Sequence, residues 1–330
     1  MATRPSTPSL TPSQKFSAQQ VANTAIRYAM VGVLVLVMIF FATSQPRFAT
    51  TDNLLTILTA AAPFAFISLG QTLVILTGGI DLSVGSVIAV SAMSAAWVSI
   101  HLHLPVGLLV VVPLLVGLVA GSVNGFVVAI VKVPPFVATL GMMTLASGFA
   151  YVIGHGAPIN GLQSDFGTIA NTKILGFTIP VVVMVVLIIA LGVIMRRTSW
   201  GLRVYAVGGN ELATRIAGVN ANRILFSVYA ISGTLAGLSG IMLASRTING
   251  APTTGTGYEL DSIAAVVIGG ASLAGGRGTI WGTTIGLFLI QILNNGLDIL
   301  IVPSYWQKVI KGALIVTAVA IDVWAARRRK

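Results

Sequence analysis

Residues 106–131 read VGLLVVVPLLVGLVAGSVNGFVVAIV, a stretch without a single charged side chain. A helix that crosses a bilayer needs about 20 mostly apolar residues, so this stretch is long enough to span one. The same window applied to the rest of the chain finds about ten candidate spans. They centre near 28–44, 54–77, 84–100, 106–131, 136–154, 179–195, 224–245, 259–273, 280–297 and 305–324. We therefore predict an all-α, polytopic bundle of about ten transmembrane helices, fewer if the short, glycine-interrupted runs at 259–273 and 280–297 do not cross.

The composition agrees with a membrane protein. The chain has 330 residues, of which 55% are apolar and 8% are charged, whereas soluble domains carry roughly 25% charged residues. Its mean hydropathy is +0.95. So few charges cannot cover the surface of a soluble protein of this length, and the composition also excludes a disordered or collagen-like chain. Because the chain contains no cysteine, disulfides, a thiolate metal site and a cysteine nucleophile are excluded.

The formal net charge is +11, which in a soluble protein suggests nucleic acid as a partner. Here the cations lie between apolar runs, so the excess of Lys and Arg on the cytoplasmic side of membrane proteins explains them better. With the N-terminus inside, 14 of the 19 Lys and Arg residues fall in cytoplasmic gaps. The same orientation places two segments rich in Gly, Pro, Asn and Thr, 154–178 and 246–258, outside as surface loops. We predict that both termini are cytoplasmic and that the chain binds no nucleic acid.

This orientation divides the chain into three parts. Residues 1–27, rich in Ser, Thr, Pro and Gln, are predicted to be a disordered cytoplasmic tail. Residues 28–325 form one transmembrane domain, with its longest cytoplasmic loop at 196–223. Residues 326–330 are a basic cytoplasmic tail.

Two glycine-rich stretches resemble each other. Residues 78–85, GGIDLSVG, and residues 269–276, GGASLAGG, share glycine at their first, second and eighth positions and leucine at the fifth. Paired glycine interruptions in the two halves of a transporter mark broken helices near the pathway, although two tight turns would give the same pattern. The candidate helix-break or gating residues are Gly78, Gly79, Asp81, Gly269 and Gly270.

Asp81 has two compatible interpretations. It is suited to be the N-cap of a helix that starts at Leu82, where its side chain would accept backbone N–H bonds. It is also suited to lie beside an aqueous path, since acidic residues at membrane depth usually mark function.

The longest cytoplasmic gap contains a predicted short helix. Asn210 is suited to be its N-cap, Glu211 suits the positive end of a helix dipole, and Gly218 is suited to stop it. The spacing of the apolar residues places Leu212, Ile216 and Val219 on one face. Such a helix either lies on the membrane surface or docks into a cytoplasmic partner.

The chain lacks the motifs of common catalytic and nucleotide-binding sites. It contains no G-x-x-x-x-G-K-[ST] sequence, so no phosphate-binding loop of its own is predicted. Neither H-E-x-x-H nor G-x-S-x-G occurs, and His101, His103 and His155 do not have metal-ligand spacing. We expect no catalytic residue, no metal and no cofactor bound by this chain.

Four stretches together carry a family resemblance. They are GGIDLSVGS from residue 78, AVGGNELATRIAGVN from 206, GTGYELDSIAAVVIGGASLAGGRGT from 255 and LNNGLDIL from 293. With them the chain resembles the membrane permease subunit of ribose-type ABC sugar importers over about residues 50–325. The resemblance implies the bundle of type II ABC importers in a bacterial inner membrane, translocating a monosaccharide by alternating access.

The resemblance also implies partners. A second permease subunit, identical or a sister chain, would share the pathway, and a periplasmic sugar-binding protein would deliver the substrate. A cytoplasmic ABC ATPase with two nucleotide-binding halves would use ATP and Mg²⁺ to drive transport. By position, the segment from Asn210 to Gly218 would be the helix that couples to this ATPase. Its implied contact residues are Asn210, Glu211, Ala213, Arg215 and Gly218.

A neutral sugar is bound by amides and hydroxyls, which are less costly to bury than charges. The candidate pathway residues are Gln71, Asn124, Gln291, Asn294 and Asn295. The same side chains would also suit bonds between neighbouring helices. Permeases for branched-chain amino acids, nucleosides or a furanose signal are alternatives. An ion-coupled carrier is less favoured, because it needs ionisable groups buried in the bundle.

Overall fold

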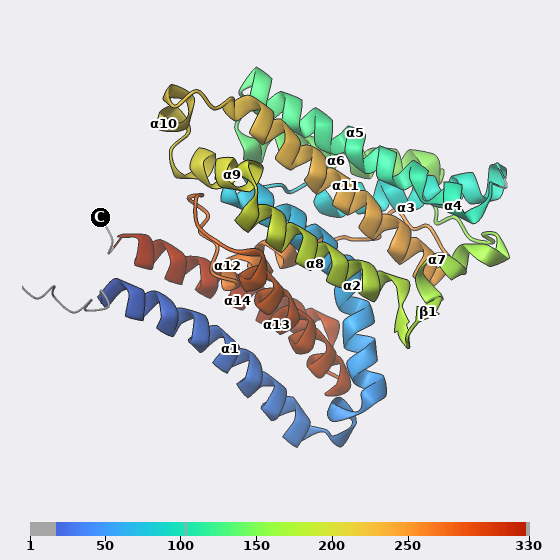
Figure 1. Cartoon of the computed structure of the whole chain (residues 1–330). Coiled ribbons are helices and arrows are strands. Elements are labelled where there is room, and N and C mark those ends of the chain that lie inside the picture. The colour runs from blue at the N-terminus through green and yellow to red at the C-terminus, as the bar shows by residue number, and fades with distance from the viewer. Residues whose placement is uncertain (1–17, 103, 328–330) are drawn as a thin grey trace, which may run out of the picture.

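The computed structural model describes residues 18–102 and 104–327, which are mainly helical (Figure 1). The helices are α1 (Ala18–Ser44), α2 (Thr51–Leu76), α3 (Val84–His101), α4 (Val106–Leu109), α5 (Val111–Phe126), α6 (Pro135–Ile153), α7 (Thr168–Asn171), α8 (Ile179–Arg197), α9 (Ser199–Gly209), α10 (Glu211–Ile216), α11 (Ala221–Thr247), α12 (Tyr258–Ile268), α13 (Ile280–Ile299) and α14 (Ser304–Arg327). Short helical turns form η1 (Pro46–Ala49), η2 (Val127–Val131) and η3 (Ser164–Gly167). The strands β1 (Lys173–Ile174) and β2 (Phe177–Thr178) pair as an antiparallel hairpin.

Seven helical segments within the described ranges are long and apolar enough to cross a membrane. They contain α2, α3, α5, α6, α8, α11 and α13, with α4 and η2 extending α5 at its two ends. The predicted all-α, polytopic bundle is therefore confirmed. The candidate span at 259–273 is wrong, because α12 has eleven residues and ends at Ile268, too short to cross.

The remaining two candidate spans lie in α1 and α14, which are not among these seven. Within α1, residues Met30–Ser44 form an apolar helical stretch. Residues 1–17 of the predicted tail, and residues 328–330, lie outside the described residues, whereas residues 18–27 form the first turns of α1.

Helices α2, α3 and α11 form the centre of the bundle. Every residue of α2 from Ala61 to Leu76 is buried. On the periphery, α5, α6 and α8 expose large apolar side chains, among them Val119, Phe149, Val152 and Val186. Such exposure suits helices that face lipid, since lipid tails are as apolar as these side chains.

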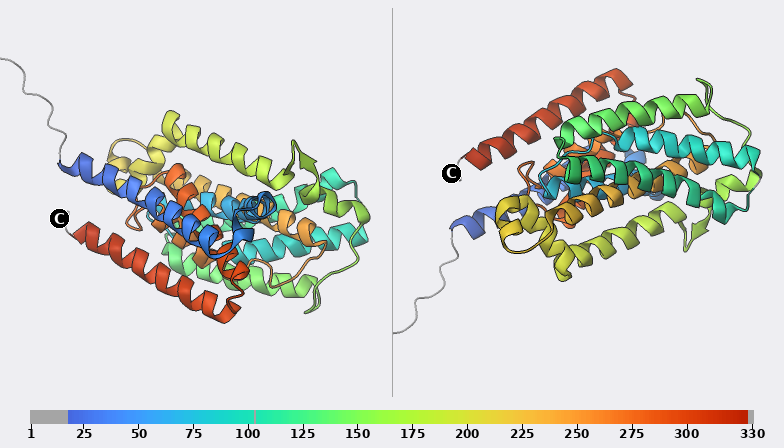
Figure 2. Two further views of the ribbon diagram at one scale, coloured as in Figure 1. Left: turned by 90° about the horizontal axis from the view of Figure 1, so that it is seen from below. Right: turned by 90° about the horizontal axis from the view of Figure 1, so that it is seen from above.

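The two ends of the bundle differ in charge. Figure 2 shows the start of α1 and the end of α14 at the same end as α9 and α10, opposite the β1–β2 hairpin. We call these the α10 end and the hairpin end. The α10 end carries Lys132, Arg196, Arg197, Arg203, Arg215, Arg223 and Arg277, whereas the hairpin end carries Arg47, Lys173 and Arg246, with Lys308 and Lys311 near the start of α14.

Helices α5 and α11 pack through glycine. Gly117 and Gly121 of α5 face Gly233 and Gly237 of α11, and a methyl group at any of these four positions would collide with the backbone of the other helix. Small residues at four-residue spacing let two helix backbones approach closely in a membrane, where van der Waals packing holds helices together. This contact joins α5 to the central helix α11.

The segment between α11 and α12 enters the bundle. Gly250 lies against Ala92 and Ala96 of α3, and Gly255 lies against Ile88 of the same helix. The expectation of a surface loop at 246–258 holds only in part, since Thr253 and Thr256 are exposed whereas Gly250 and Gly255 are buried against α3. The segment descends along α3, so that α12 starts inside the bundle, where Tyr258 makes an edge contact with Phe64 of α2.

Gly121→Ala is expected to destabilise the protein, because the added methyl group collides with the carbonyl of Tyr229. Overpacking of this kind costs about 1–3 kcal/mol, which lowers the thermal midpoint of the purified protein in detergent. Gly148→Ala is the matched control, since Gly148 of α6 has open space around it. Equal midpoints for the two variants would contradict the packing described for α5 and α11.

Candidate functional site at the paired glycine breaks

The first break, residues 77–83, separates α2 from α3. The amides of Gly78 and Gly79 donate to carbonyls three and five residues earlier, at 2.9 and 3.1 Å, and Gly78 has a φ of 81°. This is the usual glycine stop of a helix, because a side chain at positive φ is strained. Gly79 is required for space, since a side chain there would collide with the buried Tyr229.

Buried polar side chains hold the irregular backbone of this break. The amide of Gln71, oriented to pair both groups, donates to the carbonyl of Asp81 and accepts from its N–H, at 3.1 and 3.3 Å. Asn124 of α5 donates to the hydroxyl of Ser83 at 2.9 Å, and Thr139 of α6 donates to a carbonyl within the break at 3.1 Å. Irregular backbone inside a membrane bundle needs such partners in place of water. Whether Gln71 and Asn124 also line a pathway stays a prediction.

The carboxylate of Asp81, 1% exposed, lies at the centre of these contacts. It accepts from the amide and hydroxyl of Ser83, at 2.9 and 2.6 Å, and from Ser232 of α11 at 3.2 Å. Helix α3 begins at Val84, so the prediction that Asp81 caps a helix starting at Leu82 is wrong. Asp81 instead closes the turn before the helix. Ser232 lies about three turns into α11, roughly 16 Å from its start, so this carboxylate is well inside the bundle.

The second break, residues 269–279, separates α12 from α13. The amide of Gly270 and the next amide donate to carbonyls three and five residues earlier, at 2.8 and 3.1 Å, and Gly270 has a φ of 84°. This is the same helix stop as at Gly78. Gly78 is therefore equivalent to Gly270, and its alignment with Gly269 is wrong by one residue, because matching letters do not reveal which glycine carries the positive φ.

The two breaks meet at the α10 end, together with α9. The amide of Gly276 donates to the carbonyl of Leu76 at the end of α2, at 2.9 Å, and the hydroxyl of Tyr205 in α9 donates to the carbonyl of Gly278 at 3.0 Å. A side chain at Gly208 would collide with the Leu76 carbonyl, so glycine lets α9 lie this close. The breaks and the segment that leads to α10 form one packed unit.

Helix α10 is short and capped. The side chain of Asn210 accepts from the amide of Ala213 at 2.9 Å, and Gly218 follows the helix with a φ of 82°. Glu211 accepts a hydrogen bond from Arg215 at 2.6 Å. This bond lowers the pKa of Glu211, so the carboxylate is ionised at neutral pH. The N-cap and the glycine stop expected from the sequence are both present.

A polar network ties α10 to the neighbouring helices. Lys132, which follows η2, lies 3.7 Å from Glu211. Lys132 and Arg215 both donate to the side-chain oxygen of Asn222 in α11, at 2.8 and 2.5 Å. Because these groups are largely exposed, each ion pair stabilises the fold by less than about 1 kcal/mol, and the network serves to position α10.

Two apolar side chains of α10 are exposed at this charged end. Leu212 is 69% exposed and Ile216 is 80% exposed, whereas Val219, expected on the same face, is partly buried against the core. Exposed apolar side chains at this position suit either a membrane surface or a cytoplasmic partner, so the role of this face stays a prediction.

The other predicted pathway residues lie in the half of α13 toward the hairpin end. Asn295 exchanges two hydrogen bonds of 2.9 Å with Asn53 of α2. The side-chain oxygen of Asn294 is buried, and no donor within the described residues reaches it. Gln291 is half-buried. The five predicted pathway residues thus fall into two groups, one at the first break and one on α13.

The sequence did not single out the hydroxyls of this site. Ser83, Thr139 and Ser232 bond across elements, and the buried hydroxyls of Thr72 and Thr283 lie 2.7 Å apart between α2 and α13. Ser and Thr in helices commonly bond the carbonyl four residues earlier. Only the fold tells which of them also reach another segment.

These features define a polytopic membrane protein with broken helices buried in its bundle, an arrangement found in transport proteins. A family model described as "Branched-chain amino acid transport system / permease component" matches residues 53–319. The chain therefore belongs to this family of permease components, which are transport subunits rather than enzymes, and it is an integral membrane protein.

Several curated relatives are sugar permeases by name. The ribose import permease protein of Escherichia coli (strain K12) is 44% identical over 89% of this chain and 92% of the relative. The ribose import permease protein of Haemophilus influenzae is 40% identical over 94% of this chain and 97% of the relative. The fructose import permease protein of Rhizobium meliloti is 38% identical over 84% and 79%. No solved structure matches the chain.

Asn124→Asp is expected to destabilise the protein by about 1–3 kcal/mol, because it removes the donor to Ser83 and adds a second buried carboxylate near Asp81. Asp81→Asn also destabilises, since it replaces an acceptor of three hydrogen bonds. The double variant restores one carboxylate and one amide around Ser83, so its thermal midpoint in detergent should recover in part. Losses that simply add in the double variant would show that the two side chains do not act together.

Proposed function

We propose that this chain is the translocating subunit of an ATP-driven monosaccharide importer. Relatives that are 40–44% identical over most of the chain are named for ribose, and a fructose and a xylose permease also match. The observation that carries the mechanism is the packing of both breaks against the segment that leads to α10. This arrangement gives force applied at α10 a direct route into the bundle.

The candidate pathway side chains are uncharged amides, which supports a neutral sugar as the transported substrate. The family description mentions amino acids, whereas the relatives are named for sugars. Gln71, Asn124, Gln291, Asn294 and Asn295 carry amides, which bind hydroxyls without burying a charge. A zwitterionic amino acid would require charged or helix-end recognition. An ion-coupled carrier would require several ionisable groups buried in the bundle, and among the described residues Asp81 is the one fully buried charged side chain.

In the proposed mechanism, motion enters the permease at α10. A separate cytoplasmic ATPase binds the exposed Leu212 and Ile216, and closure of its two nucleotide-binding halves around ATP and Mg²⁺ moves α10. Contacts made by Tyr205 and Gly208 pass this motion to the ends of α2 and the second break. Two permease subunits, arranged as in type II importers, then rock and expose the pathway to the other side.

The charge difference between the two ends supports the orientation. The α10 end, rich in Lys and Arg, faces the cytoplasm of a bacterial cell. The start of α1 and the end of α14 lie on that side too. The hairpin end faces the periplasm, where a soluble sugar-binding protein delivers the substrate across the inner membrane.

The permease reconstituted with its ATPase is expected to import D-ribose, D-xylose or D-fructose only with ATP. Proteoliposomes are prepared with ATP on the α10 side and the loaded binding protein on the hairpin side, and uptake of radiolabelled sugar is measured. An ATPase that cannot hydrolyse ATP is the control. Sugar uptake that runs equally well without ATP would reject the ATP-driven pump.

Glu211→Lys and Ala213→Asp are expected to uncouple ATP hydrolysis from uptake while the permease stays in the membrane. Glu211→Lys gathers a third cation beside Lys132 and Arg215, and Ala213→Asp alters the surface of α10. The measurement is sugar transported per ATP hydrolysed. Undiminished coupling in both variants would mean that α10 does not receive the motion of the ATPase.

A further pair of substitutions separates docking from folding. Leu212→Ala combined with Ile216→Ala removes two exposed apolar side chains and should weaken binding of the ATPase at least tenfold, since each buried methylene contributes about 0.8 kcal/mol. Leu175→Ala at the hairpin end, where Leu175 is 95% exposed, should leave ATPase binding unchanged.

A further inference from the structure

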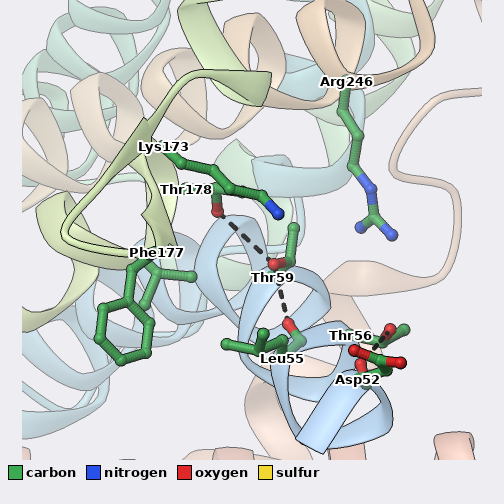
Figure 3. A pocket seen from close by; sticks show the side chains of 10 residues that line it. Asp52, Leu55, Thr56, Thr59, Lys173, Phe177, Thr178 and Arg246 are labelled. Carbon is green, nitrogen blue, oxygen red and sulfur yellow. Dashed lines mark hydrogen bonds between the residues drawn. The ribbon is translucent and has the colours of Figure 1, made fainter.

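A second polar site lies at the hairpin end, remote from the breaks and from α10. A pocket of about 270 Å³ opens between the start of α2, the β1–β2 hairpin, the start of α8 and the end of α11 (Figure 3). Small-molecule sites usually have volumes of roughly 300–1,000 Å³. The pocket is near the lower limit of this range, so it suits one ligand of about the size of a monosaccharide.

Charges of both signs line this pocket. Figure 3 shows Lys173 and Arg246 extending toward the space above Thr59, with Asp52 at the far end. Within the part of the chain that the structure describes, none of these three charged side chains forms an ion pair. Lys and Arg can only donate hydrogen bonds, and an ionised Asp can only accept them. The pocket therefore offers donors on one side and an acceptor on the other.

Hydroxyls and apolar surface complete the lining. The hydroxyls of Thr59 and Thr178 lie 3.5 Å apart, and the hydroxyl of Thr56 donates to the backbone carbonyl of Asp52 at 2.9 Å. Leu55 and Val181 also line the pocket. The hydroxyls of Thr56 and Thr59 already donate to backbone carbonyls four residues earlier, so they are left to accept hydrogen bonds from the hydroxyls of a ligand.

We propose that this pocket is an entry subsite for the sugar, a proposal that rests on the proposed function. Each hydroxyl of a neutral sugar is both donor and acceptor, which matches Asp52, Lys173 and Arg246 together. A phosphate or an acidic side chain would match the two cations but would be repelled by Asp52. A cationic ligand would be attracted by Asp52 but repelled by Lys173 and Arg246. A zwitterionic amino acid would also pair with both signs of charge, but relatives of this chain are named for sugars. A neutral polyhydroxylated molecule satisfies all three side chains.

The position of the pocket suits this role. It lies at the end proposed to face the periplasm, and four of its residues, Asp52, Leu55, Thr56 and Thr59, lie on α2, whose other end leads into the first break. The sugar is held there after it leaves the binding protein and before the pathway opens. Each permease subunit carries this subsite within its own chain.

The absence of cysteine from the chain permits a direct test. Thr56→Cys introduces a single thiol into the pocket, and Ala157→Cys is the control, an exposed position in the 154–178 segment that does not line the pocket. The permease–ATPase complex in nanodiscs is labelled with a membrane-impermeant maleimide. The probe is the sugar that the complex transports among D-ribose, D-xylose and D-fructose. Labelling is repeated with inorganic phosphate, with the zwitterionic amino acid L-leucine and with the sugar-free binding protein.

The transported sugar is expected to slow labelling of Thr56→Cys but not of Ala157→Cys. Adding Asp52→Asn should raise the sugar concentration for half-protection about tenfold, as expected for loss of a hydrogen bond to a charged group, whereas Asp298→Asn, an exposed carboxylate outside the pocket, should not. Protection by phosphate, by L-leucine or by the sugar-free binding protein, with no effect of sugar, would overturn the subsite. If none of the three sugars is transported, the proposed function fails, and the proposal of a sugar subsite fails for that reason.

Discussion

Polypeptide that leaves a helix inside a membrane bundle must find its hydrogen-bond partners within the protein, because lipid supplies none. The first break meets this requirement with side chains from several helices. Gln71 pairs the backbone of Asp81, Asn124 and Ser232 bond the Asp81–Ser83 turn, and Thr139 bonds a carbonyl of the break. The arrangement of the central helices is therefore tied to one irregular stretch of chain.

The same constraint explains where glycine is found. Breaks need residues that accept positive φ, as at Gly78 and Gly270, and helices that carry polar partners must approach closely, as α5 and α11 do through Gly121 and Gly233. Gly208 lets α9 reach the carbonyl of Leu76. The result is a set of close backbone contacts that joins α9, which directly precedes α10 in the chain, to the end of α2 and the second break, and this packing is suited to carry rigid-body motion.

Much of the fold was predictable from the sequence, because apolar runs of membrane length and the charges between them are local signals. The capped helix from Asn210 to Gly218 was predictable for the same reason, since a cap, a helical face and a glycine stop lie close together in the chain. The candidate span at 259–273 was wrong because an apolar run does not tell whether its helix starts at the surface or inside the bundle. The start of the helix after Asp81 was predicted two residues too early, at Leu82 instead of Val84. The carboxylate of Asp81 also accepts a hydrogen bond from Ser232 of α11, which is far away in the sequence. The paired breaks were recognised by composition, but their contact through Gly276 and Leu76 depends on the fold.

The entry pocket and the breaks lie at opposite ends of α2, so one helix connects the proposed sugar site to the segment proposed to receive motion from α10. The direct measurement of that motion uses spin labels at Ala217→Cys, directly after α10, or Ala274→Cys in the second break. Each is paired with Phe149→Cys on α6, in the permease–ATPase complex with and without ATP. If motion of α10 reaches the breaks, ATP changes both distances together. A change in the distance from Ala217 with no change in the distance from Ala274 would contradict this coupling.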